Sequence, residues 1–234
     1  MKILALDSTA IAASVALCED EALLGEFTIQ NGNTHSETLL PLAESALKFF
    51  SLTAEDVDLF AVSVGPGSFT GVRIGVATAK GLAFGRGKPC VGVSTLEALA
   101  ENLTVAEGLI CPVMNARRSQ VYTALFRSEN GKMTRLMPDS AMAITELDAL
   151  LSQYDEPVYL VGDGYDITAS LLKHPIHNTP HRLRPQSAYS VAQVAKRLYE
   201  QGYATTDALL APIYLRPSQA ERERAEREAA KQST

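Results

Sequence analysis

The chain has 234 residues, of which 46% are hydrophobic, and it carries a formal net charge of −6 with a pI of about 5.3. This length and composition fit one large or two small domains with a substantial core. The negative charge argues against a large phosphate-neutralising surface, although an acidic subunit of a complex that processes nucleic acid is compatible with it.

The first half of the chain predicts a three-stranded meander, a helix, a further strand and a second helix. Apolar runs mark strands over 3–8, 12–18 and 23–29, and helical spacing follows over 38–50. A strand over 58–64 then leads into a helix that ends near residue 86. His35 lies between Thr34 and Glu37, whose spacing is that of a capping box, so we expect it at the start of the first helix.

A glycine-rich link, residues 65–75, joins the strand over 58–64 to the helix that follows it. Gly65 and Gly67 permit a tight turn, and Ser68 is a candidate N-cap. Such a link is either a capped strand-to-helix turn or a phosphate-binding site at the start of a helix. The Lys-Ser/Thr ending of a P-loop is missing, and the residues alone leave both interpretations open.

The same order of elements returns in the second half. Strands are expected over 110–115, 120–127 and 132–137, a helix over 144–151, and a strand over 157–162 before another helix. The repeat predicts an α/β fold of two tandem β-β-β-α-β-α domains, each a mixed sheet flanked by helices. We expect the domains to cover 1–102 and 103–218, followed by a charged helical or disordered tail over 219–234.

The cysteine and hydropathy patterns predict a soluble, cytoplasmic protein. Cys18, Cys90 and Cys111 lie in apolar runs without CxxC spacing, so we expect small buried side chains and neither disulfides nor metal ligands. No signal peptide precedes the first strand, and no apolar run approaches the roughly twenty residues of a membrane span.

The duplicated unit resembles the actin, Hsp70 and sugar-kinase superfamily. Within that superfamily, the runs 3–9, 65–75 and 92–96 resemble the TsaB (YeaZ) family, the bacterial partner of the TsaD threonylcarbamoyl transferase in tRNA modification. The resemblance is dense over residues 1–100 and returns at 115–118, 162–164 and 211–216. It implies an actin-like, RNase H-like fold for both domains.

The resemblance also implies a candidate site at the end of the first strand. The superfamily places phosphate contacts there, whereas the residues themselves also fit an Asx or Ser turn. The candidate anion or nucleotide site comprises Asp7, Ser8, Thr9, Gly65, Gly67 and Ser68.

This chain differs from the catalytic paralogue of the family, the transferase, at the position of a metal-binding motif. Where the paralogue holds its metal with a run like His-Leu-Glu-Gly-His, this chain has Thr95-Leu96-Glu97-Ala98-Leu99. Threonine and leucine cannot replace two imidazoles as metal ligands. We therefore expect no catalytic residues, no metal and no cofactor in this chain alone. ATP or ADP is expected only at an interface of a complex. A second histidine group, His174, His177 and His181, lacks a fourth ligand and is expected in a solvated loop.

The two helices of the first half have more apolar surface than one sheet needs, which predicts a partner. By resemblance, the partner is a TsaD-like transferase or, in its absence, a second copy of this chain, and the contact is a four-helix interface. A TsaE-like ATPase would join the complex, and tRNA would bind only through it. The predicted interface residues are Leu39, Ala43, Leu47, Phe50, Gly71, Gly75, Thr78 and Leu82.

These features predict a non-catalytic scaffold for the threonylcarbamoyladenosine (t6A) modification of tRNA, at the adenosine adjacent to the anticodon. The alternative is a nucleotide-dependent phosphotransferase of the same superfamily that acts on a small substrate. That activity needs a carboxylate facing the cleft and a glycine-rich adenosine loop, for which the run 162–164 is the candidate.

Overall fold

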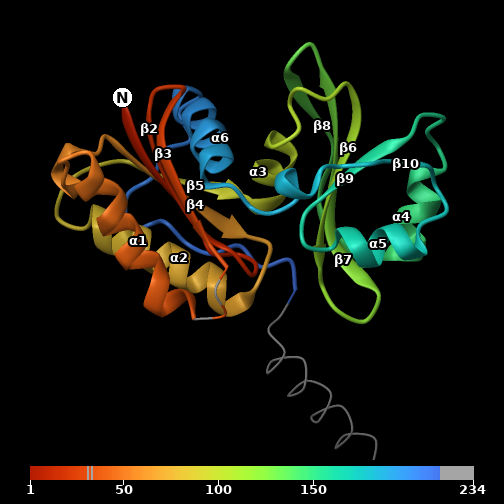
Figure 1. Ribbon diagram of the computed structural model, residues 1–234, viewed down its shortest axis with the longest axis horizontal. Helices are drawn as coiled ribbons and strands as arrows, with labels where there is room; N and C mark the ends of the chain where they lie inside the picture. The colour runs from red at the N-terminus through yellow and green to blue at the C-terminus, as the bar shows by residue number, and fades with distance from the viewer. Residues whose placement is uncertain (31, 33, 217–234) are drawn as a thin grey trace, which may run out of the picture.

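The computed structural model describes residues 1–30, 32 and 34–216, so the tail predicted over 219–234 lies outside the described residues. Two five-stranded sheets, each flanked by helices, lie beside one another (Figure 1). Within the described part of the chain, no helix is long and apolar enough to cross a membrane.

The first sheet has the strand order β3-β2-β1-β4-β5. Strand β1 pairs antiparallel with β2 and parallel with β4, which in turn pairs parallel with β5, so the sheet is mixed as predicted. The elements of this half are β1 (Lys2–Asp7), β2 (Ala13–Glu19), β3 (Ala22–Ile29), α1 (His35–Phe49), the 3-10 turn η1 (Ala54–Asp56), β4 (Leu59–Gly65), α2 (Phe69–Ala83), β5 (Cys90–Ser94) and α3 (Thr95–Glu101).

The second sheet repeats this plan with the order β10-β9-β6-β7-β8. Strand β6 occupies the place of β1, antiparallel to β7 and parallel to β9. Its elements are β6 (Gly108–Asn115), β7 (Gln120–Glu129), β8 (Lys132–Ala143), α4 (Ile144–Leu151), β9 (Val158–Val161), α5 (Tyr165–Leu171), β10 (Ile176–His177), the 3-10 turn η2 (His181–Leu183) and α6 (Ala188–Glu200). The predicted repeat is confirmed, and β8 extends six residues beyond its predicted end.

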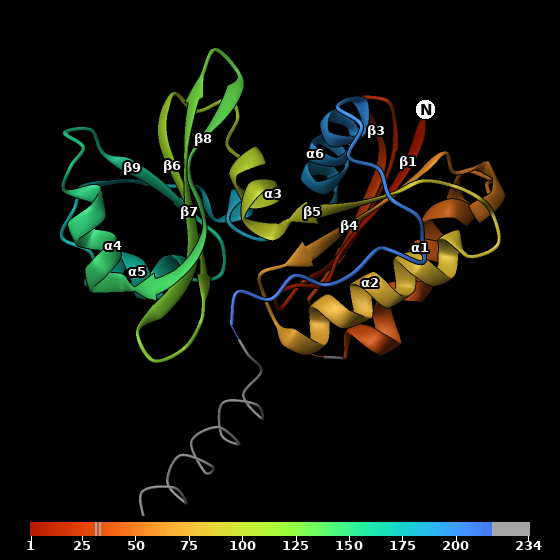
Figure 2. The same ribbon diagram turned by 180° about the vertical axis from the view of Figure 1, so that it is seen from behind.

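Alternating residues of the first sheet face two different covers. Leu4, Leu6 and Val62 pack against α1 and α2, whereas Ile3 and Val93 face the opposite side. That opposite side is covered by α6, as both views show (Figures 1 and 2). The C-terminal helix therefore joins the core of the first domain.

The segment after α6 also returns to the first sheet. Thr205 pairs with Cys90 of β5, and the Ile213 N–H donates to the carbonyl of Val64 at 2.7 Å. Leu210 is buried in the core beneath α2. The division at residue 102 stays a prediction, but residues 188–213 contribute to the first sheet although they follow the second sheet in sequence.

Helices α1 and α2 lie side by side on the outer face of the first sheet (Figure 1). The structure corrects part of the predicted partner interface here, because Leu39, Ala43 and Leu47 are buried in the chain's own core. Gly71 and Gly75 face β1, where added Cβ atoms would lie 2.0 Å from the Ser8 carbonyl oxygen and 2.7 Å from the Ser8 hydroxyl. These small residues permit close packing of α2 on its own sheet and do not line a free surface.

Candidate functional site

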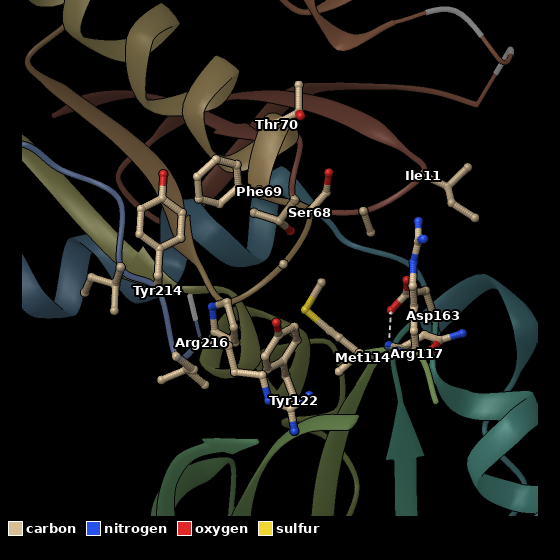
Figure 3. A pocket seen from close by; sticks show the side chains of 18 residues that line it. Ile11, Ser68, Phe69, Thr70, Met114, Arg117, Tyr122, Asp163, Tyr214 and Arg216 are labelled. Atoms are coloured by element: carbon tan, nitrogen blue, oxygen red, sulfur yellow. Dashed lines mark hydrogen bonds between the residues drawn. The ribbon is translucent and has the colours of Figure 1, made fainter. Parts of the chain in front are cut away.

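A cavity of about 510 Å³ lies between the two domains, at the carboxyl ends of β1, β4, β6 and β9 (Figure 3). Crevices outside the carboxyl ends of strands are the usual ligand sites of α/β sheets. Both halves of the repeat line this cavity, and the final described segment, 213–216, forms a further wall.

Behind the first-domain wall lies Asp7, which is fully buried at the end of β1. Its Oδ1 accepts hydrogen bonds from the Thr9 N–H and the Thr9 hydroxyl, both at 2.8 Å, and its Oδ2 accepts one from the Ser63 hydroxyl. Burial raises the pKa of the Asp7 carboxyl above its ordinary value, and these hydrogen bonds oppose that shift. The Asp7–Thr9 bond is that of the Asx turn that the sequence left open.

The glycine-rich link closes the same wall by tight packing. Gly65 has a φ of +118°, and a Cβ there would lie 2.3 Å from the Ile213 carbonyl oxygen. A Cβ at Gly67 would lie 2.5 Å from the carbonyl oxygen of Thr9. The Ser68 hydroxyl accepts the Gly71 N–H at 3.3 Å, which confirms the capped strand-to-helix turn.

The structure brings all six residues of the predicted anion site to one edge of the sheet, but it gives most of their polar groups internal partners. Ser8 is buried, and its hydroxyl donates to the Gly71 carbonyl at 2.9 Å. Only Thr9, Gly67 and Ser68 of the six line the cavity. The anion site itself stays a prediction.

The second-domain wall is more open. Asn115 ends β6, and its Oδ1 accepts the N–H of Arg117 at 2.8 Å, while the Asp163 carboxylate accepts the Asn115 N–H at 3.3 Å. Asp163 is exposed as a residue, but the protein around its carboxyl restricts hydration and raises its pKa. In the candidate adenosine loop, a Cβ at Gly162 would lie 2.2 Å from the Val113 carbonyl oxygen, so this glycine permits close packing on β6.

Aromatic and arginine side chains that sequence reasoning did not select complete the cavity. Phe69 stacks on Tyr214 with ring centroids 4.7 Å apart, and the Arg73 guanidinium lies 3.9 Å from the Phe69 centroid. Arg216 donates to the Gln120 amide oxygen at 2.6 Å and lies 5.8 Å from the Tyr122 centroid. Phe69 and Arg73 lie in the run 65–75, and Tyr214 and Arg216 in the run 211–216, which the resemblance marked without showing that the two runs lie together in space.

The segment in place of the paralogue's metal motif ties the domains together. Thr95 and Leu99 are buried in α3, and the Glu97 carboxylate pairs with Arg135 of β8 at 2.6 Å. Neither Thr95 nor Leu99 offers an imidazole, a thiolate or a carboxylate to a metal.

The histidine group predicted in a solvated loop is only partly in one, because His177 lies on β10 beside β9, whereas His181 begins η2 and is exposed. His174 Nε2 lies 2.9 Å from the Glu156 carbonyl oxygen, and the His177 ring stacks on Tyr159 at 4.2 Å. At the start of α1, the Thr34 N–H donates to the Glu37 carboxylate at 3.3 Å, which confirms the capping-box position of His35. Among the described residues, no three His, Cys, Asp or Glu side chains form a potential metal site.

Comparison with known proteins agrees with this architecture. Residues 29–224 match the family model described as "TsaD: tRNA N6-adenosine threonylcarbamoyltransferase". A protein of Bacillus subtilis named tRNA threonylcarbamoyladenosine biosynthesis protein TsaB is 34% identical over 74% of this chain and 76% of its own length. The protein of the same name from Escherichia coli is 30% identical over 92% of this chain and 95% of its own length.

Solved structures extend the likeness to three dimensions. YeaZ from Pseudomonas aeruginosa superimposes with a TM-score of 0.80 at 25% identity, covering 92% of this chain and 99% of that one. Sequence and structure therefore agree on two mixed sheets of the actin-like type. The chain belongs to the TsaB (YeaZ) family of the actin-like superfamily.

Proposed function

We propose that the chain is a non-catalytic subunit of the cytoplasmic machinery for t6A modification of tRNA, and that it binds a TsaD-type transferase through α1 and α2. The names of its relatives and the TsaD family model support the pathway. A TsaE-type ATPase joins the same complex, and any ATP or ADP binds at an interface of the complex. When the transferase is absent, α1 and α2 pair with those of a second copy.

The observation that carries this proposal is the exposed apolar surface of α1, α2 and their C-cap residues Phe50 and Phe84. Leu40 is 43% exposed, Phe49 75% and Phe84 74%. Phe50 is 38% exposed, and the predicted interface residues Thr78 and Leu82 are partly buried. Large apolar side chains gathered on two adjacent helices mark a protein-binding face.

The polar groups near the cavity support a non-catalytic role. A phosphotransferase needs a carboxylate free to act on substrate, but both Asp7 oxygens accept hydrogen bonds from protein groups. Of the acidic side chains in the described residues, only Asp163 lines the cavity. Transfer chemistry is therefore assigned to the partner.

Interface variants must be chosen from exposed positions. We expect Leu40→Arg or Ala77→Arg to weaken binding of the purified transferase at least about 30-fold, since a charge buried in such an interface costs about 2–4 kcal/mol. Ala77 and Ala149 are both exposed helical alanines, the first on α2 and the second on α4 of the other domain. Ala149→Arg is therefore the matched control.

Titration calorimetry with the transferase, together with a modification assay, gives the readout. Circular dichroism confirms that each variant is folded. Folded α1 and α2 variants that bind and support modification like Ala149→Arg would place the interface elsewhere. ATP hydrolysis or phosphorylation of a small substrate by the chain alone would favour the phosphotransferase.

A further inference from the structure

Most of the described arginines away from the interdomain cavity pair with a carboxylate, and Arg182 is the exception. Arg86, Arg127, Arg135, Arg184 and Arg197 each pair with a carboxylate. By contrast, no carboxylate of the described residues forms an ion pair with the arginine rim, a name used here for Arg73, Arg117, Arg118 and Arg216.

Three separate segments bring the arginine rim together. Arg73 lies on α2, Arg117 and Arg118 form the β6–β7 turn, and Arg216 ends the described C-terminal segment. Arg117 and Arg216 line the cavity itself. Arg73 contacts the lining residues Phe69 and Tyr214, to whose hydroxyl its Nε donates at 2.8 Å.

The β6–β7 turn has an unusual backbone. Arg117, Arg118 and Ser119 have φ values of +63°, +54° and +54°, a left-handed run in which bulky residues are uncommon. Both arginines are exposed, and Figure 3 shows Arg117 extending from the second domain toward Ile11 of the first. The turn thus places one positive side chain across the mouth of the cavity.

Neutral groups orient two rim arginines without compensating their charge. Arg216 lies near Tyr122 and donates to an amide oxygen, and Arg73 lies over Phe69. Asp163 is the acidic residue among those lining the cavity, and Figure 3 shows it near Arg117. Among the lining residues, one carboxylate is therefore matched against two guanidinium groups, so the lining is positive in a chain whose net charge is −6.

A positive rim beside aromatic rings that line a cavity is the chemistry that recognises single-stranded nucleic acid. Guanidinium groups bind phosphate oxygens in bidentate fashion, and aromatic rings stack on bases. Tyr122 and Tyr214 both line the cavity and lie beside rim arginines. The glycine-rich and Asp7 turns are a poorer phosphate site, since most of their polar groups already bond to one another.

We propose that the arginine rim binds the phosphodiester backbone of an RNA strand, with a base stacked on Tyr122 or Tyr214. The inference rests on the proposed function in identifying that RNA as the tRNA substrate of the complex. Few phosphates are contacted, so this chain alone binds tRNA weakly at physiological salt and adds to the affinity supplied by other subunits.

The test is tRNA binding by the assembled complex, measured by fluorescence anisotropy between about 50 and 200 mM salt. The variants are Arg117→Ala with Arg118→Ala, and separately Arg216→Ala. We expect about tenfold weaker binding for the double variant at about 100 mM salt, and a salt slope reduced by about 1 for each arginine removed. Arg182→Ala is the matched control, because Arg182 is exposed, lies outside the cavity lining and forms no ion pair with another described residue.

Each result decides the proposal. Native affinity and salt slope in both rim variants would overturn it. So would a loss of AMP or ATP binding in the rim variants while tRNA binding is unchanged, since the rim would then hold free nucleotides. If the complex does not form, the proposed function fails, and the same variants are compared for tRNA binding by this chain alone at about 50 mM salt.

Discussion

The two copies of the repeat use the same backbone device at the cavity but place it in different environments. Asp7 ends β1 and accepts the N–H of Thr9 at 2.8 Å, and Asn115 ends β6 and accepts the N–H of Arg117 at the same distance. Asp7 and Thr9 are buried, whereas Asn115 and Arg117 are exposed. The two copies thus share the turn, but it belongs to a buried polar cluster in the first copy and to an exposed, positively charged one in the second.

A second pair of equivalent positions supports this comparison. Gly65 ends β4 with a φ of +118°, and Gly162 directly follows β9 with a φ of +116°. An added Cβ would meet a backbone carbonyl oxygen at 2.3 Å and 2.2 Å, respectively. Close packing at the strand ends is therefore common to both copies, although their side chains differ.

The largest losses of stability are expected at the two glycines, where both copies have the same close backbone packing. Gly65→Ala and Gly162→Ala should each lower the free energy of unfolding by about 3–5 kcal/mol, because each adds a backbone clash at a positive φ. Urea denaturation measures the loss. Gly81→Ala, whose Cβ would meet nothing within 4 Å, is the control and should not destabilise. A loss below 1 kcal/mol at one glycine would show that the copies are packed differently.

The next prediction separates the buried turn from the exposed one. Asp7→Ala should lower the free energy of unfolding by about 2–3 kcal/mol, because it leaves buried donors of Ser63 and Thr9 without an acceptor. Asn115→Ala should cost less than about 1 kcal/mol, since water reaches the exposed turn. Equal losses in urea denaturation would contradict the contrast between the two copies.

A pH dependence should distinguish the two turns as well. The pKa of the Asp7 carboxyl is raised by burial above its ordinary value of 3.8, so the folded state holds this proton more tightly than the unfolded state. Between the ordinary and the raised pKa, the Asp7 contribution to stability therefore falls as pH rises. The Asp7→Asn variant should therefore lack the fall in stability with rising pH that the native chain shows. Midpoints of urea denaturation, measured for both proteins across acidic pH, give this difference. Identical pH profiles of stability for the variant and the native chain would contradict a raised pKa of Asp7 in the folded state.

The smallest effect is expected from making the second turn resemble the first. Asn115→Asp should change the free energy of unfolding by no more than about 0.5 kcal/mol, because the added carboxylate is hydrated and can still accept the Arg117 N–H. Thermal denaturation is sensitive enough for this comparison. A larger stabilisation would indicate a strong ion pair with the arginine rim.

Sequence reasoning predicted the strands and their repeated order because buried runs and turn residues are local signals. It misplaced Gly71 and Gly75, since a face of small residues looks the same whether it packs against a partner helix or its own strand. It also did not assign α6 to the first sheet. The apolar stripe of α6, which includes Val191 and Val194, is compatible with either sheet, and only tertiary packing selects between them.

The arginine rim was beyond sequence reasoning for a related reason. Arg117 and Arg216 are separated by about one hundred residues and line the same cavity only because the C-terminal segment crosses from α2 to β7. The resemblance had marked both runs but gave no contact between them. The candidate phosphate turns, in contrast, could be located from sequence because they follow two adjacent strands.

The position of α6 has a consequence for how the chain is made. Synthesis completes β1 to β5 long before residues 188–195, which cover one face of that sheet. Until then Ile3, Leu59 and Val91 lack the cover of α6, and the growing chain presents an apolar sheet surface of the kind that promotes aggregation. The half of the protein made first is therefore the half that finishes folding last.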